Sequence, residues 1–277
     1  MAVLLAVLGA AVLHAVWNAV AHGVPDRLGG FALIGLSSGL CGLVAVVTTG
    51  TPPAGAWPYI LASAVLHLIY QAGLLASYQL GQFSQVYPLA RGTSPWVVAV
   101  VAIVVLHQNP VPLELAGVLL ISAGLFGLVL IGGLPSRRQA PALLAAFGTG
   151  LLIAAYTVVD GVAVHKIPLA SYLGWVFMLQ GLIVPLFVVI RRGPGFLIQA
   201  RGYLWAGLGG GIVSLAAYGL VLWAQTRGAL AAIAALRETS IIFGAVIGAL
   251  FFGERFGRNR AVAAAVVVAG IVLINLA

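Results

Sequence analysis

Apolar runs of about twenty residues recur along the whole chain, and most charged residues fall between them. A helix of ~20 residues crosses the ~30 Å hydrocarbon layer of a bilayer. Only 6% of the residues are charged and the mean hydropathy is +1.16, whereas roughly 25% of a soluble domain is charged. Backbone polar groups in lipid must be satisfied within the protein, and runs of this length are typical of helices. We therefore expect an all-α integral membrane protein.

Glycine, proline and charged residues divide the apolar sequence into about ten segments. We expect transmembrane helices near residues 2–21, 29–48, 57–79, 84–106, 112–132, 141–163, 169–190, 201–224, 229–251 and 259–276. The first segment has neither a basic leader nor a small-residue cleavage site, so we interpret it as a retained helix and not as a signal peptide. The connections are short, which leaves no room for a soluble catalytic domain.

The two halves of the chain share a polar motif inside an apolar run. Residues 91–94 read Arg-Gly-Thr-Ser and residues 237–240 read Arg-Glu-Thr-Ser. A slightly different shift aligns two polar pairs in the first helix of each half, His14 with Asn18 and Tyr156 with Asp160. We expect two five-helix repeats, over 1–134 and 141–277. Because five is an odd number, the second repeat enters the membrane from the opposite side, and such inverted repeats are typical of alternating-access transporters.

Basic residues cluster in the expected loops, so the net charge of +8 indicates membrane topology and not nucleic-acid binding. Loops after odd-numbered helices hold nine basic residues and loops after even-numbered helices hold two, Lys166 and Arg227. This bias favours both termini outside. Cys41 is the only cysteine, which excludes an internal disulfide and a thiolate metal cluster. We expect no metal and no cofactor.

Three segments carry a family resemblance: Leu-His-Ala-Val-Trp-Asn at 13–18, Tyr-Pro-Leu-Ala-Arg-Gly at 87–92 and Phe-Phe-Gly-Glu-Arg-Phe at 251–256. With the ten-helix plan, they make the whole chain resemble the EamA family of the drug/metabolite transporter superfamily. The resemblance implies a substrate cavity between two halves, metabolite or amino-acid export with proton coupling or exchange, and a multi-pass location in the bacterial inner membrane. It also implies cytoplasmic termini, opposite to the charge bias, so orientation stays open. Gln108 stands where the second repeat has Glu254, which argues against a symmetric pair of acids.

Ionisable residues inside the apolar runs are the first candidates for a site. An ionised side chain at the centre of a transmembrane helix costs about 2.5–3.5 kcal/mol or more, and such residues usually face the bundle interior. Arg91 lies between Pro88 and Pro95, where a broken helix could offer backbone groups to a ligand. The alternative is that either arginine extends to the interface or forms a purely structural ion pair. We expect Glu238 to point about 100° away from Arg237 around the helix, toward a different partner.

Polar and aromatic residues at helical spacing extend this set along the third and eighth helices. The predicted substrate-binding residues are Arg91, Arg237, Tyr70, Gln71, Tyr78, Trp17, Asn18, Tyr156, Tyr218 and Trp223. The predicted coupling residues, which could carry a proton, are His14, Asp160 and Glu238. For Asp160 the alternative is neutralisation by one of the arginines, and for His14 it is simple hydrogen bonding.

Small residues spaced four apart predict close helix packing. Such pairs occur at Gly35 with Gly39 and at Gly244 with Gly248, and Gly209–Gly211 add a third site. Helix packing within the chain is the first interpretation and dimerisation the second. Membrane lipid and a small-molecule substrate are the expected partners, for a monomer or a homodimer, with no nucleic acid.

The sequence lacks His-Glu-x-x-His, Gly-x-Ser-x-Gly and a glycine-rich phosphate loop. We therefore expect no enzyme and no ATP-driven pump, but a secondary transporter of a small polar metabolite such as an amino acid or organic anion, working as an exporter or exchanger. Two alternatives stay open: an intramembrane enzyme that acts on a lipid-linked substrate, and a flippase for a lipid-linked solute.

Overall fold

A computed structural model describes residues 1–81, 83–129, 137–193, 195–251 and 257–277. The long helices are α1 (Ala2–Gly23), α2 (Arg27–Thr49), α3 (Trp57–Leu80), α4 (Phe83–Val104), α5 (Pro112–Val129), α6 (Ala140–Ala163), α7 (Leu169–Arg192), α9 (Leu204–Gln225) and α12 (Arg258–Leu276). The shorter ones are α8 (Phe196–Gln199), α10 (Leu230–Arg237) and α11 (Ser240–Phe251), with 3-10 turns η1 (Ala54–Ala56), η2 (Arg137–Gln139) and η3 (Ala200–Tyr203). The described residues form no strand, which confirms the all-α expectation.

Each of the ten expected segments contains helix, with ends that agree to within a few residues. Seven spans in the described part of the chain are long and apolar enough to cross a membrane. The ninth segment is divided, because α10 ends at Arg237 and α11 begins at Ser240. The break expected near Arg91 is absent: α4 runs through Pro88 and Pro95 as one helix. The discontinuity therefore lies in the segment that aligns with α4, and not in α4 itself.

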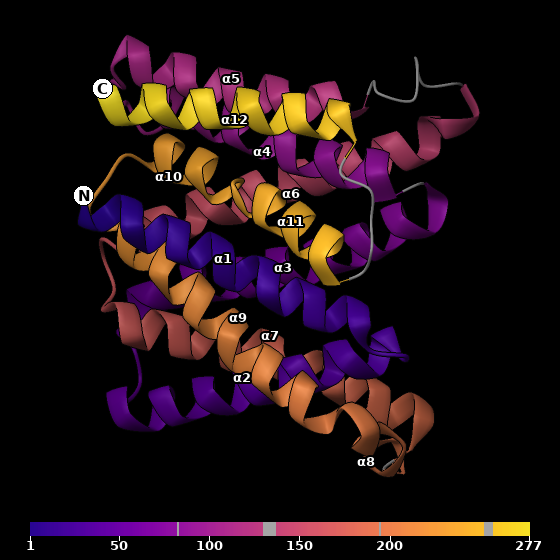
Figure 1. Ribbon diagram of the computed structural model, residues 1–277. Coiled ribbons are helices and arrows are strands. Elements are labelled where there is room, and N and C mark those ends of the chain that lie inside the picture. The colour runs from indigo at the N-terminus through magenta and orange to yellow at the C-terminus, as the bar shows by residue number, and fades with distance from the viewer. Residues whose placement is uncertain (82, 130–136, 194, 252–256) are drawn as a thin grey trace.

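Close helix contacts hold the bundle together at glycines. In Figure 1, α5 and α12 lie side by side at one edge of the bundle. There, a Cβ added to Gly117 would lie 2.6 Å from the carbonyl oxygen of Gly270. A Cβ on Gly35 would lie 2.7 Å from the carbonyl oxygen of Gly181, so the face formed by Gly35 and Gly39 packs inside the chain, between α2 and α7.

Of the other glycines for which close packing was predicted, those on α9 contact a neighbouring helix at two of three positions. Gly210 and Gly211 bring α9 close to Ile34 and Ser37 on α2, whereas a Cβ on Gly209 would meet nothing within 4 Å. A Cβ on Gly244 would also meet no described atom within 4 Å, so the described residues show no close packing at Gly244 within the chain. The surroundings of Gly248 are outside the described part of the structure. Spacing by four identifies two small residues on one helix face, but not whether that face has a neighbour.

One ion pair closes the bundle at the end opposite to the two termini. Arg192 at the end of α7 donates hydrogen bonds to the carboxylate of Asp26, which precedes α2. Tyr203 Oη also donates to Asp26, at 3.3 Å. The hydrogen bond from Arg192 holds the pKa of Asp26 below its usual value. Because both side chains are about a third exposed, this pair orders the loop more than it stabilises the fold.

Candidate functional site

Two buried arginines from different halves of the chain face one glutamate. Arg91 Nη1, on α4, lies 3.4 and 3.3 Å from the two carboxylate oxygens of Glu238. Arg237 Nη2, at the end of α10, lies 3.5 Å from Glu238 Oε1. Arg91 and Arg237 are each 4% exposed and Glu238 is fully buried. We call these three residues the arginine–glutamate cluster, and they are the most strongly charged feature of the described interior.

Glu238 lies at the junction of α10 and α11. The amide of Glu238 donates to the carbonyl of Ala235, and the amide of Thr239 donates to the carbonyl of Leu236. This three-residue spacing is that of a 3-10 turn, which is tighter than an α-helix. The different partner expected for Glu238 is Arg91, which donates to both carboxylate oxygens. The expected turn away from Arg237 assumed a continuous α-helix and is incomplete, because Arg237 Nη2 stays within 3.5 Å of Glu238. The tightened turn lets one carboxylate lie close to both arginines.

His14 on α1 joins the cluster from a third helix. Its Nε2 contacts Arg91 Nη2, and its Nδ1 accepts a hydrogen bond from Trp17 Nε1 at 3.2 Å. Guanidinium and indole groups are donors only, and a neutral imidazole has a single acceptor nitrogen. One of the two donors therefore has no true acceptor in His14. A second proton on the ring would remove its last acceptor, so this geometry disfavours a proton-carrying role for His14.

Aromatic rings lie next to both arginines. The Arg237 guanidinium carbon lies 5.9 Å from the centre of the Tyr156 ring, and that of Arg91 lies 5.4 Å from the Tyr87 ring. Tyr156 in turn lies against the rings of three residues from α3 and α9, at centroid distances of 4.0 Å for His67, 5.5 Å for Tyr70 and 6.4 Å for Tyr218. Three of the predicted tyrosines, Tyr70, Tyr156 and Tyr218, thus form one aromatic layer next to the cluster.

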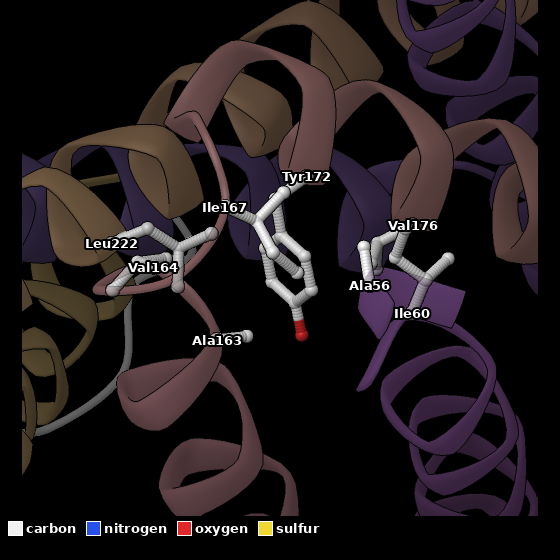
Figure 2. Close-up of a cluster of buried hydrophobic side chains, with 8 residues drawn as sticks. All are labelled: Ala56, Ile60, Ala163, Val164, Ile167, Tyr172, Val176 and Leu222. Carbon is white, nitrogen blue, oxygen red and sulfur yellow. The ribbon is translucent and has the colours of Figure 1, made fainter. Parts of the chain in front are cut away.

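Asp160, near the end of α6, lies at the far end of this layer and has no arginine partner. Its carboxylate accepts a hydrogen bond from Tyr172 Oη at 2.5 Å and another from Tyr218 Oη. In Figure 2, the Tyr172 ring lies between Ile167 on one side and Ile60 and Val176 on the other. Within the described residues, no ion pair joins Asp160 to Arg91 or Arg237. In place of neutralisation by an arginine, which was the alternative interpretation of Asp160, its carboxylate accepts from two phenol hydroxyls.

We expect Tyr172→Phe to destabilise the protein by about 1–3 kcal/mol, because it leaves one buried oxygen of Asp160 without a donor. Tyr59→Phe is the matched control, since its hydroxyl accepts from Lys166 Nζ in an exposed contact. The apparent melting temperature of the purified protein should fall for the first variant and stay near the wild-type value for the second. Equal melting temperatures for both variants would show that Asp160 does not depend on Tyr172.

Several predicted residues lie outside the cluster. Trp223 stacks instead under the guanidinium of Arg227, 4.3 Å from the ring centre, near the end of α9. Asn18 Nδ2 donates to the His14 carbonyl of its own helix at 2.7 Å. Gln71 is half-buried in α3. The side chain of Tyr78 and the whole of Glu254 lie outside the described residues.

The sequence did not predict two contacts at the site, that of Tyr87 with Arg91 and that of Tyr172 with Asp160. Tyr87 precedes Arg91 by four residues, a spacing that places both on one face of a helix, so a signal was available. Tyr172 reaches Asp160 across the connection between α6 and α7, and no local pattern indicates this contact. A cavity of about 290 Å³ lies elsewhere, near the α4–α5 turn; its lining includes Glu114, Gln108 and Asn109 and none of the cluster residues. Within the searched residues, no three His, Cys, Asp or Glu side chains could hold a metal together.

The long apolar helices around a buried ionic cluster define a multi-pass integral membrane protein. Residues 140–276 match the model of the EamA-like transporter family, and the chain belongs to this family. Members of this family are transporters, so the chain is a membrane transporter of the drug/metabolite type.

The fold is also shared with solved structures. One, described only as a crystal structure of a protein, superposes with a TM-score of 0.76 over 99% of this chain and 96% of that chain, at 17% sequence identity. At this identity the likeness shows the fold alone. No curated protein matches the chain.

Proposed function

We propose that the chain is a secondary carrier for a small organic anion, whose carboxylate binds at the arginine–glutamate cluster. The observation that supports this most directly is that Arg237 is buried while its Nε and Nη2 have no hydrogen-bond partner among the described residues. A buried donor without an acceptor costs about 1–3 kcal/mol, and more when it is charged. The planar guanidinium fork matches a carboxylate bidentately, so a bound carboxylate would satisfy both groups.

The sign of the free charge favours an anion over an amine. Glu238 is already shared by the two arginines. Asp160 already accepts from Tyr172 and Tyr218. Neither carboxylate is left for an ammonium group, whereas Arg237 retains free donors. An amino acid would bring a positive charge that has no partner here, so organic anions are the better candidates of the two classes named from the sequence.

The position of the cluster fits a site shared by two inverted halves, which we propose span residues 1–134 and 141–277. The helix contacts support this, because the pattern of contacts stays the same when the helices of one half are exchanged for the corresponding helices of the other. α2 packs against α7 and α5 against α12, while α1 packs against α9 just as α3 packs against α6. Arg91 and Arg237, which align in the two halves, meet at this shared interface. Alternating access to such a site moves solutes across the membrane by rocking of one half against the other.

Export or exchange across a bacterial inner membrane is the physiological setting that we propose from the family resemblance. The test is uptake into proteoliposomes of four solute classes of similar size, which are monocarboxylates, dicarboxylates, amino acids and primary amines. We expect intact carboxylates to accumulate above the level in protein-free liposomes, in exchange for the same solute loaded inside. Arg137→Gln, a change at an exposed residue, serves as the matched control and should transport like the wild type.

Other outcomes of the same experiment would contradict the proposal. Uptake of amines without uptake of carboxylates would show that the substrate is a cation and not an anion. A chemically modified product, formed in detergent without any gradient, would favour the intramembrane enzyme. Movement of a lipid-linked solute between leaflets, without uptake of any water-soluble one, would favour the flippase.

A further inference from the structure

The arginine–glutamate cluster is not electrically neutral. It contains two guanidinium groups and one carboxylate, and an arginine side chain keeps its positive charge in proteins. His14, which also contacts Arg91, faces two donors and adds no negative charge. The cluster alone therefore carries one uncompensated positive charge, and a single negative charge would neutralise it.

The uncompensated charge lies mainly on Arg237. Arg91 donates through Nη1 to both oxygens of Glu238, and its Nη2 contacts His14. Arg237 lies 3.5 Å from Glu238 through Nη2 but makes no hydrogen bond there, and its Nε also has no partner among the described residues. Without Glu238, both arginines would lack a carboxylate, and the site would have room for two negative charges. The glutamate thus determines how many more negative charges the site can neutralise.

We propose that Glu238 sets the charge of the transported solute, so that the site selects a monoanion over a dianion of the same shape. This inference rests on the proposed function, in which the cluster binds the substrate carboxylate. A monoanion brings the cluster to neutrality. A dianion leaves one buried negative charge without a partner beside Glu238, and an unpaired buried charge is strongly unfavourable.

Asp160 is the other buried acid in this region, and it does not change the balance within the cluster. Both of its oxygens accept hydrogen bonds from phenol hydroxyls. It contacts Tyr218, which contacts Tyr156, and it is the Tyr156 ring that lies against Arg237. Asp160 therefore adds a distant negative charge, which opposes a dianion further and does not occupy Arg237.

The test measures binding of matched probe pairs to the purified full-length protein by the change in tryptophan fluorescence. The pairs are malonate with malonamate, succinate with succinamate, and glutarate with glutaramate, at about pH 8, where every carboxylate is ionised. Within a pair the shape is nearly the same and the charge differs by one. We expect the wild type to bind the monoamide of its preferred pair at least about tenfold more tightly than the dicarboxylate, because a like charge in a closed site costs several kcal/mol.

Glu238→Gln should shift this ratio by at least about tenfold toward the dicarboxylate. Glu238→Asp, which keeps the charge, should retain the wild-type preference. Glu114→Gln is the matched control, because Glu114 is also buried but lies near the α4–α5 turn, so its ratio should not change. A Glu238→Gln variant that folds, binds and keeps the wild-type ratio would overturn the inference while leaving the proposed function intact.

Arg237→Gln is a second variant for the case that Glu238→Gln does not fold. It makes the cluster neutral, so it should bind the monoamide at least about tenfold more weakly than the wild type. Unchanged monoamide binding by Arg237→Gln would also overturn the inference. If the wild type binds no member of any pair, the anion site itself is contradicted, and the proposed function fails together with the charge rule.

Discussion

Arg91→Gln is expected to destabilise the protein by about 3–5 kcal/mol, the usual cost of removing one partner of a buried ion pair. Arg91 makes the only hydrogen bonds that the described residues offer to the Glu238 carboxylate. Arg237 lies near Glu238 but forms no hydrogen bond with it. The substitution therefore leaves a fully buried carboxylate with one poorly placed counter-ion. Equilibrium unfolding of the purified protein in mild detergent measures the loss.

The double variant Arg91→Gln with Glu238→Gln separates the ion pair from other effects of the substitution. Removing both charges should recover part of the lost stability, because no unpaired carboxylate remains. Arg137→Gln, at an exposed position, should stay within about 0.5 kcal/mol of the wild type. If Arg91→Gln proved as stable as Arg137→Gln, the pair between Arg91 and Glu238 would not exist in the folded protein.

Gly42→Ala is expected to destabilise the bundle by more than about 3 kcal/mol, beyond ordinary overpacking. Its added Cβ would lie 2.6 Å from the amide nitrogen of Met178 and 2.7 Å from the carbonyl oxygen of Gly174. Both atoms belong to the backbone of α7, so no side chain can move aside to make room. The two helices would have to separate along their whole contact. A large fall in apparent melting temperature, with loss of folded protein from the membrane, is the expected readout.

Gly148→Ala on α6 is the matched control, with the opposite sign. Nothing lies within 4 Å of a Cβ added there, and alanine in a helix interior is favoured over glycine by about 0.5–1 kcal/mol. The same chemical change should therefore destabilise at Gly42 and slightly stabilise at Gly148. Equal effects at the two positions would contradict the close packing of α2 on α7.

Long apolar segments could be located from the sequence because their length and composition are set by the bilayer and not by tertiary contacts. The shared Arg-x-Thr-Ser motif also indicated that Arg91 and Arg237 are related, and the structure brings both to one carboxylate. The partner of Glu238 could not be predicted, because its direction depends on the 3-10 turn after Arg237, and no proline or glycine in the sequence marks that turn.

Tertiary contacts account for the other places where the structure differs from what the sequence predicted. Trp223 has the right spacing for an aromatic wall, but Arg227, which lies just beyond the end of α9, covers its ring. Asp160 is held by Tyr172 across the turn between α6 and α7, a contact that helical spacing cannot indicate. The prolines of α4 were expected to break it, yet α4 runs on through both of them. In each case the local sequence pattern was present, but the packing of neighbouring residues determined the structure that formed.

Anion uptake by Arg237→Gln proteoliposomes is the most direct test of the account. This variant keeps the hydrogen bonds between Arg91 and Glu238, so it should fold at least as well as the wild type. It removes the unpaired donors that we assign to the substrate carboxylate, so uptake of the preferred monocarboxylate should fall by at least about tenfold. A folded Arg237→Gln protein that transports the anion at the wild-type rate would contradict the claim that this buried arginine binds the substrate.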